Sequence, residues 1–186
     1  MMFIRDTEVS LRAATALVNS LPETDTDGLD RLATQDDLAA FLREFPYSGT
    51  IRRDDVELSE LRAARTRLRM LWAGDREAAV PIVNAMLREG KALPQLTIHD
   101  GYDWHIHATD DQAPLATRIT VEVAMAFVDV IRSDHFDRVR ECDADDCSAV
   151  YIDYSKNGSK RYCDTGNCGN RMNVNAYRRR KAEESA

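Results

Sequence analysis

Four cysteines, placed as two matched pairs in the last quarter of the chain, are the residues of this sequence best suited to chemistry. Cys142 and Cys147 enclose four residues, Cys163 and Cys168 enclose four more, and fifteen residues separate the pairs. Two short chelating loops joined by a spacer supply the four soft ligands of a tetrahedral zinc site. The spacing therefore predicts one structural Zn²⁺ held by these four thiolates.

The rest of the composition indicates the compartment in which these thiols would exist. The chain has 186 residues, of which 44% are hydrophobic and 31% charged, and it contains no apolar run of the ~20 residues that a membrane span needs. The N-terminal residues lack the pattern of a secretory signal, so we expect a cytoplasmic protein in which clustered thiols bind metal. Two disulfides in an exported domain, a redox switch that releases zinc, and an iron–sulfur cluster remain alternatives, although the spacing matches neither common ferredoxin pattern.

Charge is distributed unevenly along the chain. Residues 154–186 hold eight basic and three acidic residues, a net charge of +5, whereas the remainder holds 17 basic and 29 acidic residues, a net charge of −12. A basic tail on an acidic body indicates a polyanionic partner for the tail alone. The alternative is a solvated helix end, because Lys and Arg also favour helix C-termini.

The elements around the cysteines predict a small treble-clef-like module of one β-hairpin and one helix. Residues 149–154 have the composition of a strand, 156–159 form an Asn-Gly turn, and 160–162 return as a second strand. A helical pattern then runs from Asn170 to Lys181, with Cys168 at its first turn. So small a module has little core, and metal binding should supply much of its folding energy.

The N-terminal part is predicted to be mainly α-helical. Apolar residues at helical spacing predict five helices, at 8–21, 34–46, 54–73, 75–90 and 113–133. Thr34 is the predicted N-cap of the second helix. In the third helix, Val56 and Leu61 are predicted to face inward and Arg65 to lie on an Arg-rich outer face.

A β-hairpin is predicted between the fourth and fifth helices, with its turn at Asp100-Gly101. Alternation with period two predicts that Leu96, Ile98, Trp104 and Ile106 share a buried face. Thr97, His99, His105 and His107 would then form an outer polar face. A second metal site or sensor built on these histidines is the alternative interpretation.

The residues around the last cysteine resemble one known family. Cys168-Gly169-Asn170-Arg171 follows a Tyr162-Cys163 pair, precedes a basic helix, and lies downstream of a C-x4-C loop and the strand Tyr151–Ser155. This arrangement, over roughly residues 135–182, resembles the CGNR-type zinc finger family. Proteins of that family generally join the finger to an N-terminal ABATE-type domain of stress-induced transcription regulators, which residues 1–130 resemble in size and helical content. The resemblance implies a regulatory domain at 1–133 and a zinc finger at 134–186.

The chain departs from the family pattern at several positions. Tyr162 stands where members usually carry Trp, so a smaller ring must fill that place. The loop at 164–167 is more acidic and flexible than the usual apolar-leaning loop, and Asp143, Asp145 and Asp146 make the first loop acidic too. These changes bear on DNA affinity more than on zinc binding.

Candidate nucleic-acid contacts lie on the C-terminal helix and beside it. Gly169 and Asn170 are interpreted as structural, Gly169 because it would relieve crowding beside the metal. Asn and Arg are the residue types that read adenine and guanine edges. Arg171 has two interpretations, as a support of the finger or as a DNA contact. The full set of candidates is Arg171, Asn175, Arg178, Arg179, Arg180, Lys181, Lys160 and Arg161.

The function predicted from these features is a zinc-dependent DNA-binding transcriptional regulator with no enzymatic activity. The sequence contains no Gly-rich phosphate loop and no H-E-x-x-H motif, and a metal with four thiolate ligands keeps no open position for water. The N-terminal domain would sense a small-molecule effector or form a homodimer. A zinc-stabilised protein-interaction adaptor, and a ligand-binding protein or enzyme with its activity in the N-terminal domain, are the alternatives.

Overall fold

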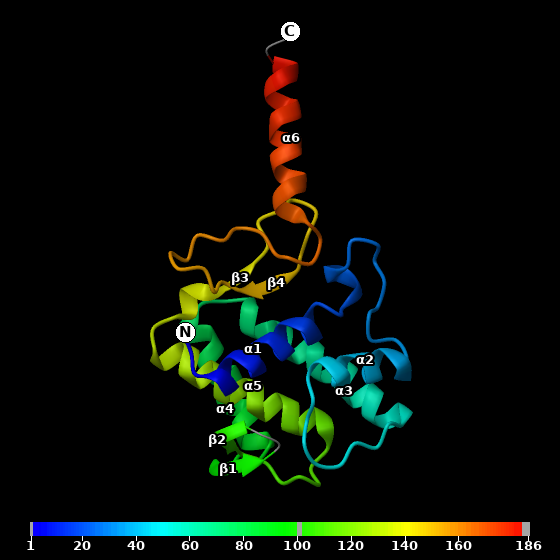
Figure 1. Ribbon diagram of the computed structural model, residues 1–186, viewed down its shortest axis with the longest axis vertical. Coiled ribbons are helices and arrows are strands. Elements are labelled where there is room, and N and C mark those ends of the chain that lie inside the picture. Colours follow the sequence, from blue (N-terminus) through cyan, green and yellow to red (C-terminus); the bar gives the residue numbers. More distant parts are fainter. Residues whose placement is uncertain (1, 100–101, 184–186) are drawn as a thin grey trace.

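The computed structural model describes residues 2–99 and 102–183, apart from the side chains of His99 and Tyr102. A helical body carries a small module at one end, and a long helix projects from that module away from the body (Figure 1). The helices of the body are α1 (Arg5–Val18), α2 (Gln35–Glu44), α3 (Asp55–Arg69), α4 (Arg76–Glu89) and α5 (Leu115–Arg132). The projecting helix is α6 (Cys168–Glu183).

Helix α5 is the centre of the body, and α1, α3 and α4 pack around it. Its long buried side is apolar apart from Arg118, and Phe127 on that side meets Trp72 edge-to-face at a ring distance of 5.3 Å. Trp72 belongs to a short 3₁₀ turn, η2 (Met70–Trp72), that follows α3 directly. The core thus rests on large apolar side chains whose spacing in the sequence is that of amphipathic helices.

Side-chain caps fix where three of the helices begin. Thr34 accepts a hydrogen bond from the main chain of Asp37 and Asp37 bonds back, forming a capping box at the start of α2. This confirms the predicted N-cap. Asp54 and Asp75 cap α3 and α4 by accepting hydrogen bonds from the amides of Glu57 and Ala78, without a capping box, and Pro81 lies inside α4 rather than at its start.

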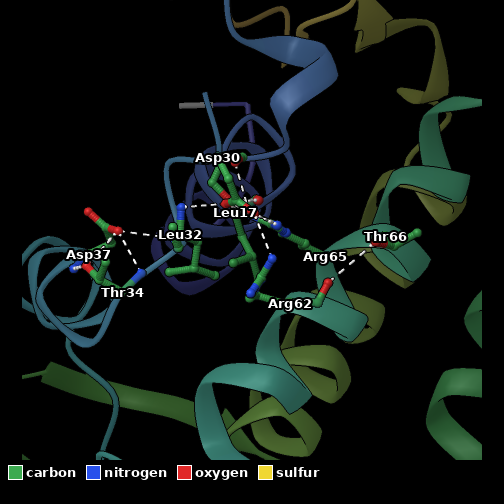
Figure 2. Close-up of polar contacts among 10 residues, drawn as sticks. Leu17, Asp30, Leu32, Thr34, Asp37, Arg62, Arg65 and Thr66 are labelled. Carbon is green, nitrogen blue, oxygen red and sulfur yellow. Dashed lines mark hydrogen bonds and ion pairs between the residues drawn. The ribbon is translucent and has the colours of Figure 1, made fainter. Parts of the chain in front are cut away.

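Two predictions on α3 are wrong. Val56 is 57% exposed, and Arg65 is buried with an exposed fraction of 3%. Figure 2 shows Arg65 reaching Asp30, whose two carboxylate oxygens each accept a hydrogen bond of 2.6 Å from it. The hydrogen bonds of Arg65 hold the pKa of Asp30 down, at about 2, although burial acts in the opposite direction. The sequence could not show that a loop carboxylate reaches this helix.

The β-hairpin consists of β1 (Gln95–His99) and β2 (Tyr102–His107), paired antiparallel. Its predicted turn at 100–101 lies outside the described residues. The predicted assignment of its two faces is wrong: Leu96, Ile98, Trp104 and Ile106 are all exposed, Trp104 by 65%, whereas His105 and His107 are partly buried against the body. Alternation shows which residues share a face but not which face is covered.

The module at the other end holds β3 (Val139–Glu141) and β4 (Val150–Ile152), which pair antiparallel. The predicted strand at 160–162 is absent from this described stretch, because β4 pairs with the segment before the first cysteine loop instead. Val150 and Ile152 belong to the same buried cluster as the helices of the body. The boundary between the two predicted domains, 1–133 and 134–186, remains a prediction.

None of the helices in the described part of the chain is both long enough and apolar enough to cross a membrane.

Candidate metal centre

The four cysteines come together from four separate places in the module. Cys142 follows β3, Cys147 ends the first loop, Cys163 begins the second loop and Cys168 is the first residue of α6. Their sulfur atoms all lie within 4.8 Å of one another. The Cys147–Cys163 and Cys163–Cys168 sulfur pairs are each 3.7 Å apart. Four thiolates at the usual zinc–sulfur distance in a tetrahedron would be about 3.8 Å apart, so the donor set fits Zn²⁺.

The cysteines are free thiols in a nearly closed setting. Cys142, Cys163 and Cys168 are buried and Cys147 is partly exposed, and Ala144, Ala149 and Tyr151 complete the small apolar cluster around them. Burial raises the pKa of the Cys147 thiol well above its ordinary value. A bound dication supplies the compensation that buried thiolates need. With four protein ligands the ion has no open position, so the site is structural.

Main-chain hydrogen bonds join the two cysteine loops. The Cys163 amide donates to the Cys142 sulfur at 3.4 Å, and the Asp143 amide donates to the Arg161 carbonyl at 2.9 Å. The Cys142 amide donates to the Ala149 carbonyl at 2.9 Å, which continues the β3–β4 ladder to the first ligand. The sheet thereby sets the position of one cysteine pair, and the second pair is set by its contacts with the first.

Arg171 has a structural place at the metal centre. Its Nη2 donates to the Cys168 sulfur at 3.1 Å, its Nε to the Gly166 carbonyl at 3.2 Å, and its Nη1 to Asp146. The guanidinium therefore connects a ligand sulfur with both cysteine loops. These hydrogen bonds favour the interpretation of Arg171 as a structural support of the finger over its interpretation as a DNA contact.

The other two signature residues lie beside this arrangement. Asn170 Nδ2 donates to Asn167 Oδ1 at 2.8 Å, which stabilises the left-handed backbone of Asn167, at φ 50°. A Cβ added at Gly169 would lie 3.7 Å from the Tyr162 ring, an ordinary contact. Contacts with residues other than its chain neighbours therefore do not require glycine at this position.

Two family models match the chain, and together they cover most of it. One, "Putative stress-induced transcription regulator" (ABATE), matches residues 11–134. The other, the CGNR zinc finger, matches residues 138–181. The chain belongs to the ABATE family. Its C-terminal module is a CGNR zinc finger and its cofactor is one Zn²⁺. A search of curated proteins found no match to this ABATE protein.

A buried aspartate that follows β4 organises the loop of the ABATE protein's finger. Asp153 is fully buried and accepts hydrogen bonds from the amides of Ser155, at 2.8 Å, and Lys160, at 2.9 Å. Burial acts to raise its pKa, but these hydrogen bonds hold the pKa below its usual value. Arg138 closes the loop from the other side by donating to the Ser155 carbonyl at 2.6 Å. Sequence reasoning did not assign a role to Arg138, because nothing local indicates this contact.

The basic residues near the base of α6 are paired with acids. Lys160 Nζ lies 2.6 Å from Asp164, and Arg161 Nε lies 2.9 Å from Asp143. Each cation also lies over a tyrosine ring of the module. These two candidates for DNA contact thus bond the acidic loops that distinguish this ABATE protein's finger from the family pattern.

The remaining candidates lie together on the projecting part of α6. Within the described helix, only Cys168 is buried. All the candidate residues farther along it are exposed: Asn175, Arg178, Arg179, Arg180 and Lys181. Tyr177 is 58% exposed, so its ring is not packed against the rest of the module. Six of the eight candidate DNA contacts thus lie on α6 of the ABATE protein, and five of them are on its exposed part.

The described histidine side chains of the hairpin do not form a metal site. His105 Nε2 and His107 Nε2 are 3.2 Å apart, and the His99 side chain lies outside the described part. Among the described side chains, only the four cysteines bring enough ligand atoms together for an ion.

Proposed function

We propose that this chain is a zinc-dependent DNA-binding regulator of transcription whose helix α6 docks in the major groove. The observation that carries the proposal is the exposure of α6 beyond its first turn, where it projects from the body (Figure 1). Cys168 and Arg171 fix the base of the helix. Its 16 residues span about 24 Å, and the major groove admits an α-helix.

The side chains of α6 suit both kinds of DNA contact. Asn175, Arg178 and Arg179 recur at three- and four-residue spacing and share one side of the helix, where they would read base edges. Arg180 and Lys181 would contact phosphates. Val174 is 46% exposed and would meet a thymine methyl group or a sugar. The residues thus divide into those that specify and those that position.

The charge distribution supports docking by α6 alone. The acidic body would repel a phosphate backbone, so a projecting basic helix keeps it at a distance. Lys160 and Arg161 would add phosphate contacts only by leaving Asp164 and Asp143. We therefore rank them, with Arg171, below the residues of α6.

The other parts have supporting roles in the proposed function. Zinc holds the base of α6 and performs no chemistry, so the protein is a regulator and not an enzyme. The helical domain at 1–133 senses an effector or forms a dimer, and the protein works in the cytoplasm.

Fluorescence anisotropy with a labelled mixed-sequence duplex tests the proposal. Zinc-loaded protein should bind with an affinity that falls steeply with salt. Arg180→Ala/Lys181→Ala, which removes the two proposed phosphate contacts, should flatten the slope of log K against log salt by about one to two. Arg43→Ala/Arg88→Ala removes the same charge from exposed positions on the body and is the matched control. Absence of salt-dependent binding with one zinc per chain, or an equal loss in the control, would overturn the proposal and favour a protein-interaction adaptor.

A further inference from the structure

A cavity of 190 Å³ lies in the helical body, far from the zinc centre. Its walls come from α1, α5, β2 and the segment at 46–48. A water molecule occupies about 30 Å³ in the liquid, so the cavity has room for a small organic molecule. Ile4, Val9, Met125 and Ala126 give it apolar wall area.

Three carboxylates line this cavity, and the described part of the chain gives them little compensation. They belong to Asp6 on α1 and to Glu122 and Asp129 on α5. Asp129 Oδ2 accepts a hydrogen bond of 2.5 Å from Thr7 Oγ1. Among the described residues, Glu122 has neither a hydrogen-bond donor nor an ion-pair partner, and Asp129 has no ion-pair partner.

The cation whose charge acts on Glu122 makes its hydrogen bonds elsewhere. Arg118 is buried and donates to the carbonyls of Ser48, Thr50 and Ala113. It anchors the segment that forms one wall of the cavity. Burial raises the pKa of Glu122, and the positive charge of Arg118 offsets this only in part. With a further contribution from Asp6, the pKa of Glu122 is about 7.

The neutral polar groups of the cavity complete its chemistry. Tyr47 lines it, and burial keeps the pKa of its phenol well above the usual value, so the hydroxyl stays protonated. The Tyr47 hydroxyl makes no hydrogen bond to any described residue. His105 and His107, whose rings meet at 4.9 Å, form the wall on β2.

We propose that this cavity binds a small organic cation, a primary amine with a short apolar body. The ammonium group would donate to the carboxylate of Glu122, where the charge of Asp6 also acts. The apolar body would lie against Met125 and Ala126. An anion is disfavoured by three carboxylates, and the described side chains here do not meet the geometry of a metal site.

Binding of an amine in this cavity should be coupled to the release of a proton. A buried carboxylate with a raised pKa is partly protonated near neutral pH, and an adjacent ammonium group favours its ionised form. Glu122 should therefore release a proton when the amine binds, and affinity should rise between about pH 6 and 8. The charged groups that act on Glu122 are Arg118 and Asp6, and the other titratable groups that line the cavity are Tyr47, His105, His107 and Asp129.

Isothermal titration of the zinc-loaded full chain with n-butylamine and phenethylamine tests the site, with n-butanol and butyrate as uncharged and anionic controls. We expect saturable 1:1 binding of an amine and at least tenfold weaker binding by Glu122→Gln. Glu44→Gln, at an exposed position, should bind like wild type. The heat of binding should depend on the ionisation enthalpy of the buffer, because wild type releases a proton. This dependence should disappear in Glu122→Gln.

Three results would each overturn the assignment: no saturable binding of either amine, equal binding of butanol, or unchanged affinity in Glu122→Gln. Circular dichroism shows whether each variant is folded, and the selectivity of wild type for amines over butanol needs no variant. The regulatory meaning of the site rests on the proposed function, since an effector matters only if the finger binds DNA. The titration contains no DNA, so its outcome and that of the DNA assay are independent.

Discussion

The side-chain amide of Asn19 pairs with the main chain of Val150, 131 residues away, as a neighbouring strand would. Asn19 Nδ2 donates to the Val150 carbonyl and the Val150 amide donates to Asn19 Oδ1, each at 2.8 Å. Asn19 ends α1, and Val150 begins β4 of the finger. The free edge of the two-stranded sheet is thereby closed by the helical body. The zinc module is docked on the body rather than tethered to it.

Asn19→Ala should lower the free energy of unfolding by about 1–3 kcal/mol, because it leaves buried main-chain groups of Val150 without partners. Urea unfolding followed by circular dichroism measures this. Asn84→Ala, an exposed asparagine of α4, is the matched control and should be neutral or slightly stabilising. Equal stability of both variants would show that the pairing at Val150 contributes nothing.

Removal of a zinc ligand should unfold the finger. Cys168→Ser leaves three thiolates and frees the first turn of α6, so zinc content should fall below one per chain and helicity should decrease. A colorimetric zinc assay after dialysis, with far-ultraviolet circular dichroism, measures both. Thr165→Ala changes the same loop without touching a ligand and should retain one zinc. Full zinc retention by Cys168→Ser would contradict the four-thiolate site.

Gly169→Ala should be tolerated although it breaks the four-residue signature. The added methyl group would make an ordinary contact with Tyr162 at 3.7 Å, and Ala favours a helix by up to about 1 kcal/mol. We expect unchanged zinc content and equal or higher thermal stability. A clear loss of zinc or stability in this variant would show that the glycine has a role that the geometry does not reveal.

Asp30→Asn should destabilise the body in a pH-dependent way. The pKa of Asp30 is lowered to about 2 from 3.8, so its contribution is present above about pH 4 and disappears as pH falls through 2. At pH 7 the variant leaves buried Arg65 without its anion, at a cost of about 3 kcal/mol. Chemical unfolding at pH 7 and pH 2 measures the difference. Asp36→Asn, at an exposed position, should show no such dependence; equal effects of the two variants would contradict the role of Asp30.

The two tryptophans should differ sharply in their contribution to stability. Trp72 is buried and its Nε1 donates to the Tyr151 carbonyl at 3.2 Å, so Trp72→Ala should cost about 3–5 kcal/mol. Trp104→Ala should change stability by no more than about 0.5 kcal/mol, since Trp104 is exposed. Thermal and urea unfolding of both variants measures this. Comparable costs would place Trp104 in a core.

The same pair of residues shows how far the sequence alone could predict the fold. Trp72 lies within the apolar helical pattern predicted at 54–73, and an amphipathic helix in a body of helices has one covered side. Trp104 lies on a two-stranded hairpin, where alternation leaves both faces equally eligible until the neighbours are known. The prediction of its burial failed for that reason.

The metal centre was predictable because its information is local. Four cysteines in two short loops specify the ligands without any knowledge of the rest of the chain. The contacts that position them are not local: Asn19 with Val150, Arg69 with the Ser148 carbonyl at 2.6 Å, and Trp72 with Tyr151. No pattern within one segment indicates such pairs, so docking of the finger on the body could not be predicted.

The most direct test of the central claim is to map the DNA-binding surface by ¹H–¹⁵N NMR. Zinc-loaded, ¹⁵N-labelled protein would be titrated with a mixed-sequence duplex at low salt. The account predicts that amide shifts concentrate on α6 from Asn175 to Lys181, with small changes around the cysteines and none on α2 or α4. Shifts confined to the helical body, or no shifts while the finger holds its zinc, would contradict the claim that α6 binds DNA.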